Sequence, residues 1–211
     1  MMPRIAEPRQ AAVPTSTDQQ TRYLRILRAA EELGAETDFD HVQMHEVAKR
    51  AKVAIGTLYR YFPSKTHLYV GVMTHLVEEM EQRLRPRARL QRDPAERVFD
   101  VLVRASRSLL SKPNLAQSMM NSANGARAAN LTHVGRIDEA MSNVVLSAAG
   151  INEPTARDLS IVRLVQQAWG GILQSSLNGW LSADDAENDL RLACELLIAG
   201  TSAQGQRLEA V

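Results

Sequence analysis

The sequence predicts an all-α protein, and three observations indicate this fold class. Apolar residues recur at three- and four-residue steps in a series of segments, which is the spacing of one helical face. Aromatic residues make up only 4% of the chain, so the core must be packed mainly by Leu, Val, Ile, Ala and Met. Residues 42–65 hold two short helical patterns joined by about three residues, the layout of a helix-turn-helix.

The apolar positions of residues 42–65 define an inner and an outer side of this helix pair. The inner side is expected to contain Met44, Val47, Ala48, Ala51, Val53, Leu58 and Phe62. The outward positions are then Ala54, Ile55, Thr57, Arg60 and Tyr61. Because Gly56 has no side chain, the backbone near the front of the second helix can closely approach an external group, such as a phosphate or a base edge.

Positive charge is concentrated in the half of the chain that holds the helix pair. Residues 1–92 carry 15 Lys+Arg and 11 Asp+Glu, whereas residues 93–211 carry 10 and 13. Cations release counterions from DNA, and neighbouring Thr and Tyr hydroxyls can set the register on its backbone. An ordinary basic surface helix pair would have the same composition, so charge alone leaves both interpretations open.

The remaining chain is predicted to form helices separated by proline and glycine. Further helices are expected from Thr17 to about Gly34, from Ser64 to Pro86, from Pro94 to Pro113, from about Leu131 to Ala149, from near Pro154 to Leu177, and from about Ala183 to Ala199. The expected organisation is a disordered arm (1–16), a helix-turn-helix domain (17–64), a connecting helix (65–85), a second helical domain (86–200) and a flexible C-terminus (201–211). Movement at the far end of the connecting helix would tilt the helix pair.

Residues 47–68 also contain a long and specific motif. It comprises Val47-Ala48, Ala51-Lys52-Val53, the run from Gly56 to Phe62, Ser64-Lys65 and Leu68. This motif resembles the DNA-binding signature of the TetR family of bacterial transcriptional regulators. The chain departs from the family pattern where Lys52 replaces the turn glycine, Ala54 a frequent serine, and Gln43 the Ser or Thr that caps the first helix. The amino-acid sequence around the motif is similar to that of the KstR-type repressors of sterol catabolism in actinobacteria.

The resemblance implies a homodimeric repressor that binds a palindromic double-stranded DNA operator, with recognition helices entering major grooves about 34 Å apart. By motif position, base edges would be faced by Ala54, Ile55 and Gly56, with His45 nearby. Phosphates would be held by Thr57, Tyr59, Tyr61 and Lys65, and the expected DNA-binding set is completed by Gln43 and Arg60. The apolar Ile55 is expected to read a thymine methyl group.

The second helical domain is expected to bind a small apolar effector, because its candidate pocket segments contain few cations and several methionines. The candidate lining residues are Leu102, Met119, Met120, Met141, Val145, Trp169 and Leu173. Simple filling of core gaps by these methionines is an equally good interpretation. The resemblance to sterol-catabolism repressors implies a steroid or its coenzyme A thioester as effector.

Surplus apolar surface on the last two helices predicts a homodimer closed by a twofold four-helix interface. The candidate interface residues are Val162, Val165, Trp169, Ile172, Leu177, Leu190 and Leu197. The resemblance to TetR-type regulators implies the same interface.

The sequence lacks the features of several other classes of protein. Its single cysteine, Cys194, permits no internal disulfide, and it lies in an apolar helix stripe that predicts a buried thiol. No motif for nucleotide binding, catalysis, a cofactor or a metal is present, and His41 and His45 need not share a helix face. No signal peptide or run long enough to span a membrane is found, so a cytoplasmic protein is expected.

A transcriptional activator, or a helical ligand carrier or enzyme with an incidental basic helix pair, remains an alternative.

Overall fold

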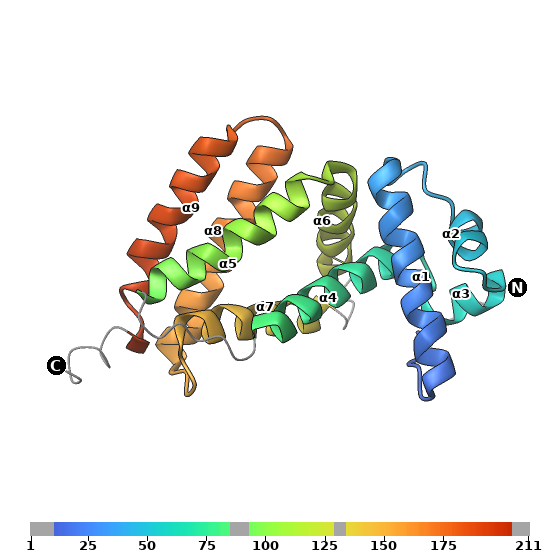
Figure 1. The fold of residues 1–211 in the computed structure, drawn as a ribbon, viewed down its shortest axis with the longest axis horizontal. Coiled ribbons are helices and arrows are strands. Elements are labelled where there is room, and N and C mark those ends of the chain that lie inside the picture. The colour runs from blue at the N-terminus through green and yellow to red at the C-terminus, as the bar shows by residue number, and fades with distance from the viewer. Residues whose placement is uncertain (1–10, 85–92, 129–133, 204–211) are drawn as a thin grey trace, which may run out of the picture.

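The computed structural model describes residues 11–84, 93–128 and 134–203 of the chain. Within these ranges the elements are α1 (Thr17–Glu36), α2 (Met44–Arg50), α3 (Ile55–Tyr61), α4 (Lys65–Leu84), α5 (Pro94–Leu110), α6 (Pro113–Ala128), α7 (Val134–Ala149), α8 (Ala156–Leu177) and α9 (Ala183–Ile198). The predicted all-α fold is confirmed. Figure 1 shows α1, α2 and α3 together at one end of an elongated molecule, with α8 and α9 toward the other.

Two hydrophobic cores divide the molecule, and α4 contributes to both. The N-terminal core contains residues of α1, α2 and α3 together with Leu68 and Tyr69 of α4. The C-terminal core joins α5, α7, α8 and α9, and α4 supplies Val70 and Val77 to it. A shift of α4 relative to one core must therefore be accommodated by the other, since close-packed interiors deform little.

Side-chain caps mark where the helices begin, and they refine the boundaries expected from the sequence. Ser16, rather than Thr17, caps α1 by accepting a hydrogen bond from the Gln19 N–H. The helix expected near Pro154 begins at Ala156, because Thr155 and Asp158 form a reciprocal capping box there. Ser182 caps α9 by accepting a hydrogen bond from the Asp185 N–H, and Gly150, which has a φ of +79°, follows the last residue of α7.

Both described chain ends are more firmly attached than the sequence indicates. Residues 11–16 were expected in a disordered arm, but the Ala12 N–H donates to the Arg60 carbonyl at 2.9 Å. At the other end, Ser202 was expected in a flexible tail, and its N–H and hydroxyl both donate to Asp158. Residues 1–10, 204–211 and the greater part of the Arg-rich run at 83–92 lie outside the described residues.

Candidate nucleic-acid interface

The turn between α2 and α3 sets the angle of the helix pair. Lys52 has a φ of 53°, so it takes the left-handed backbone that the turn glycine would provide. The next residue closes the turn, because the Val53 N–H donates to the Ala48 carbonyl at 3.0 Å. The helix-turn-helix geometry thus forms despite the lysine, with some backbone strain at this position.

The inner side of the helix pair is packed as the apolar pattern predicts. Val47 and Leu58 are fully buried, and Ala48 has 3% of its surface exposed. Ala51 and Phe62 are also buried, while Met44 and Val53 pack partly buried against the same core. This packing fixes which side of α3 faces outward.

The outer side of α3 presents an unusual set of exposed groups. Ile55 is 43% exposed and Tyr59 47% exposed, although both are large and partly apolar. An added Cβ on Gly56 would meet no atom within 4 Å, so the backbone there is open to solvent. Of the other candidates, Gln43, His45, Ala54 and Arg60 are exposed and Thr57 is half-buried.

Tyr61 does not lie on this outer surface, and its expected role in holding phosphate was wrong. Only 3% of its surface is exposed, and its ring meets that of Tyr23 edge-on at 5.7 Å between centroids. Tyr61 follows the buried Leu58 by three residues, which places both on one helical face. The aromatic ring therefore belongs to the N-terminal core.

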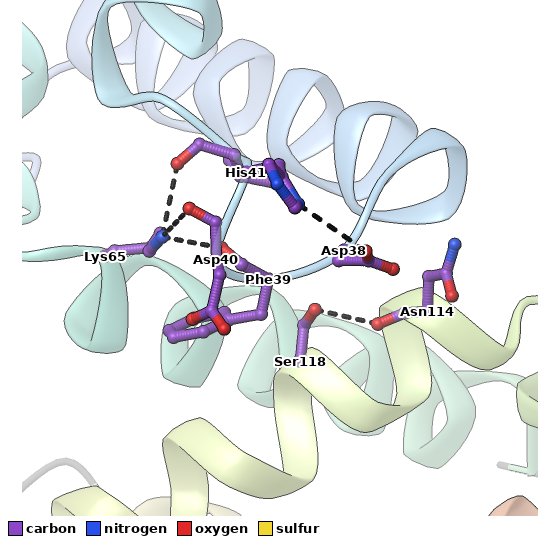
Figure 2. Close-up of polar contacts among 8 residues, drawn as sticks. Asp38, Phe39, Asp40, His41, Lys65, Asn114 and Ser118 are labelled. Atoms are coloured by element: carbon purple, nitrogen blue, oxygen red, sulfur yellow. Dashed lines mark hydrogen bonds and ion pairs between the residues drawn. The ribbon is translucent and has the colours of Figure 1, made fainter.

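Lys65 is also engaged inside the protein rather than free to meet a phosphate. Its ammonium group donates to the carbonyl oxygens of Phe39 and Asp40, as Figure 2 shows, and to that of Val42. An ammonium has three N–H donors, so all of them are used. The expectation that Lys65 holds a DNA phosphate does not fit this arrangement.

The helix pair presents less net positive charge than its composition suggests, because Arg50 forms an ion pair with a glutamate of α1. Its guanidinium donates to both carboxylate oxygens of Glu36, at 2.7 and 2.9 Å. This hydrogen bonding lowers the pKa of Glu36 and raises the pKa of Arg50. Lys49, Lys52 and Arg60 are exposed, and within the described residues the structure records no ion pair for them. Within the helix pair they are the exposed cations that could meet an external anion.

The chain matches two family models. Residues 26–72 match the model described as bacterial regulatory proteins of the tetR family, and residues 92–197 match the tetracyclin repressor-like C-terminal domain. The chain is 34% identical to the HTH-type transcriptional repressor KstR of Rhodococcus jostii, over 89% of this chain and 88% of that protein. This chain belongs to the TetR family.

Solved structures agree with this membership. A TetR transcriptional regulator from Rhodococcus sp. RHA1 is 49% identical, with a TM-score of 0.79 over 85% of this chain and 97% of the other. Thermus thermophilus FadR, a TetR-family repressor crystallised with lauroyl-CoA, shares the fold at 19% identity and a TM-score of 0.63, over 84% of this chain and 94% of FadR. The chain is thus a TetR-type transcriptional repressor with a DNA-binding helix-turn-helix, and not an enzyme.

The residues expected to line an effector pocket do not all lie in the same hydrophobic core. Five of them belong to the C-terminal core: Leu102, Met141, Val145, Trp169 and Leu173. Met120 packs against this core, but Met119 lies in the N-terminal core with its α6 neighbour Leu115. The assignment of Met119 to the effector pocket was therefore wrong. The N-terminal part of α6 packs against the helix-turn-helix domain and not into the C-terminal core.

Four of the seven residues expected at the dimer interface are buried within one chain. Val162, Val165 and Leu190 have at most 2% of their surface exposed, and Trp169 has 9% and donates its indole N–H to the Ser106 hydroxyl. They cannot contact a partner, so these assignments were wrong. Ile172, Leu177 and Leu197 are half-buried at the edge of the same core. The apolar side chains that α8 and α9 do expose were overlooked: Leu159, Leu164, Leu192 and Leu196.

The buried thiol that the sequence predicts is confirmed. Cys194 is fully buried, and burial raises the pKa of its thiol to about 12. Among the described residues, no group of His, Cys, Asp and Glu side chains is suited to hold a metal ion. None of the described helices is both long enough and apolar enough to cross a bilayer.

Proposed function

We propose that this chain acts as a homodimer that binds a palindromic operator and is released by a largely apolar effector of the steroid or steroid coenzyme A thioester class. DNA binding through α3 is supported by the exposure of its outer side, where Ile55, Gly56 and Tyr59 are open to solvent beside Arg60. Their exposure in one chain has no packing explanation, whereas a major groove would cover them.

The apolar side chains exposed on the last two helices support a dimer. Leu192 and Leu196 lie one helical turn apart on α9, with 53% and 69% of their surfaces exposed. Leu164 on α8 is 48% exposed, and Gly171, two turns further along α8, has open space where a Cβ would be. A second copy that packs its own α8 and α9 against this face would bury these side chains and close the assembly.

The effector proposal is supported by the composition of the C-terminal core. The core that contains Met141 and Trp169 is a large hydrophobic cluster, and flexible methionines can repack around a guest molecule. In α6, whose Ala126 belongs to this core, the Ser122 hydroxyl is buried and makes no hydrogen bond among the described residues. A buried group without a partner is rare in folded proteins, and a hydroxyl or carbonyl of the effector would satisfy it.

Release of DNA requires an effector that prefers the conformation in which the two reading helices are wrongly spaced. The shared position of α4 in both cores supports a mechanical link. Insertion of a ligand in the C-terminal core would displace Val70 and Val77, and Leu68 and Tyr69 on the same helix would carry that shift to the N-terminal core.

Selection from a random-sequence DNA library by the purified protein, followed by footprinting, tests operator binding. We expect a palindrome with half-sites about 34 Å apart and a thymine at the position that Ile55 faces. Recovery of a single half-site, or of no sequence at all, would contradict the dimeric operator.

Sedimentation analysis tests the interface separately. The double substitution Leu192→Glu and Leu196→Glu should convert the dimer to a monomer, because it would bury two carboxylates in an apolar contact. Leu159→Glu is the matched control, since Leu159 is also exposed on α8 but lies on a different face from Leu164. A dimer that survives the double substitution would rule out this interface.

Calorimetry with a steroid acid coenzyme A thioester, lauroyl-CoA, free coenzyme A and small polar metabolites tests the effector class. Ser122→Ala should weaken binding of the effector by roughly 2- to 10-fold, the net value of one hydrogen bond. Ser118→Ala is the control, because the equally buried Ser118 hydroxyl already donates to the Asn114 carbonyl at 2.7 Å. Binding of polar metabolites alone would exclude an apolar effector.

A further inference from the structure

The ammonium group of Lys65 joins the start of α4 to the connection between α1 and α2. Its Nζ donates to the carbonyl oxygens of Phe39, Asp40 and Val42 at 2.5, 3.2 and 3.3 Å, and it lies 4.4 Å from the centroid of the Phe39 ring. In Figure 2 the three carbonyls converge on this one nitrogen. We name this arrangement, formed by Lys65 with residues 39–42, the Lys65 clamp.

The connection that the clamp holds has little internal support. Its recorded backbone hydrogen bonds run from the N–H groups of His41 and Val42 to the carbonyl of Asp38. Among the described residues, Lys65 is the donor that the structure records for the carbonyls of Phe39, Asp40 and Val42. Without the ammonium, the partly buried carbonyls would lose their hydrogen bonds.

The position of α2 depends on this connection. Gln43 precedes α2 directly, makes no side-chain capping bond, and uses its carbonyl to accept the N–H groups of Glu46 and Val47. The start of α2 is therefore set by the backbone before it, which is Val42 and its neighbours. Since α3 packs on α2, a loose connection would misplace both helices.

The clamp is also continuous with the N-terminal core. The Phe39 ring meets the Tyr69 ring edge-on at 5.6 Å between centroids, and the Tyr69 hydroxyl donates to the Ala30 carbonyl of α1. Lys65 and Tyr69 lie one turn apart on α4. The clamp thus ties the connection to α4 and, through Tyr69, to α1.

We propose that Lys65 is a positioning residue for the DNA-reading helices. It holds α2 and α3 in the correct position and orientation and makes no phosphate contact of its own. This inference rests on the proposed operator binding. A phosphate contact would require the ammonium to leave all or part of its carbonyl set, and Phe39 and Val42 would then be left with partly buried, unpaired acceptors.

The salt dependence of DNA binding distinguishes the two roles of Lys65. Lys65→Met should weaken binding to the selected operator by roughly 5- to 100-fold, the scale of one lost base contact. The slope of log affinity against log salt concentration should stay unchanged, because no phosphate contact is lost. If Lys65 holds a phosphate, the slope should fall by about 0.9 for each protomer, and the proposal is overturned.

Arg60→Met is the matched control, because Arg60 is an exposed cation on α3 for which the structure records no side-chain partner among the described residues. It should reduce the salt slope that Lys65→Met leaves intact. Affinity for non-specific DNA should be unchanged in Lys65→Met, so the ratio of specific to non-specific binding falls. A variant that is only less stable would lose both kinds of binding equally, and that result would also overturn the proposal.

Phe39→Leu provides a second variant that retains every charge, in case Lys65→Met does not fold. It should lower the same affinity ratio at an unchanged salt slope, and amide hydrogen exchange should accelerate at His41 and Val42 but not at Leu27 in the core. Wild-type affinity in both variants would remove the positioning role. Failure of the wild-type protein to select any DNA sequence would instead count against the proposed operator binding.

Discussion

The Tyr69 hydroxyl lies 2.7 Å from the point that a β-carbon on Gly34 would occupy, and a Leu115 methyl group lies 3.1 Å from the same point. These residues belong to α1, α4 and α6, so the three helices meet where Gly34 leaves room for the tyrosine. The tyrosine is fully buried and cannot move into solvent.

Gly34→Ala should therefore destabilise the protein by about 1–3 kcal/mol, the usual cost of adding a methyl group to a packed interior. Urea unfolding measures the effect. Gly125→Ala on α6 is the control, because a Cβ there meets no atom within 4 Å. Equal stability of the two variants would show that Tyr69 moves aside at little cost.

Gly56→Ala should separate stability from DNA binding. The free protein should gain roughly 0.5–1 kcal/mol, because alanine favours a helix more than glycine and the added methyl group meets no neighbour. Binding to the selected operator should nevertheless weaken, since the methyl group would stand between α3 and the DNA. Gly135→Ala, at the matching second position of α7 and equally open, should gain stability without any change in DNA affinity.

Lys52→Gly should stabilise the protein by about 1 kcal/mol, because Lys52 has a left-handed backbone that costs a residue with a β-carbon roughly that amount. Lys52→Ala removes the same charge but keeps the β-carbon, so the difference between the two variants isolates the backbone term. Thermal or urea unfolding gives the comparison. A glycine variant no more stable than the alanine variant would mean that the turn carries no strain.

Asp158 should stabilise the folded protein at neutral pH, and this contribution to the free energy of unfolding should be lost in acid. Burial raises the pKa of its carboxyl group, but hydrogen bonds from Ser202 and Thr155 outweigh it and lower the pKa from 3.8 to about 2. Since the pKa is lower in the folded protein, the contribution is fully present above about pH 4 and is lost as the pH falls through about 2. Its size is on the order of 2 kcal/mol.

Asp158→Asn should accordingly destabilise the protein at pH 7, and the difference from the wild-type protein should shrink as the pH is lowered from 4 toward 2. Asp184→Asn is the control, because Asp184 is exposed in the first turn of α9. A difference between wild type and Asp158→Asn that stays constant across this pH range would contradict the assigned pKa.

The helix pair was predictable because its determinants are local. The spacing of Val47, Ala48 and Leu58 specifies an inner face within one or two helical turns, and the left-handed turn at Lys52 follows from its place between the two patterns. Tyr61 was misjudged because phenol rings occur both in cores and at phosphates. Its partner Tyr23 lies 38 residues earlier, beyond the reach of a local pattern.

By itself the sequence determined the all-α class, the helix-turn-helix and the TetR-type assignment, because helical periodicity and the motif at residues 47–68 are encoded by residues near one another in the chain. Only the tertiary structure decided which side chains are available. It joined Lys65 to carbonyls 23 to 26 residues away, paired Arg50 with Glu36, and turned Val162 and Leu190 into the core while leaving Leu196 exposed. The physical reason is that an apolar stripe shows that a helix is buried somewhere, but the neighbouring helices determine which part of the stripe they cover.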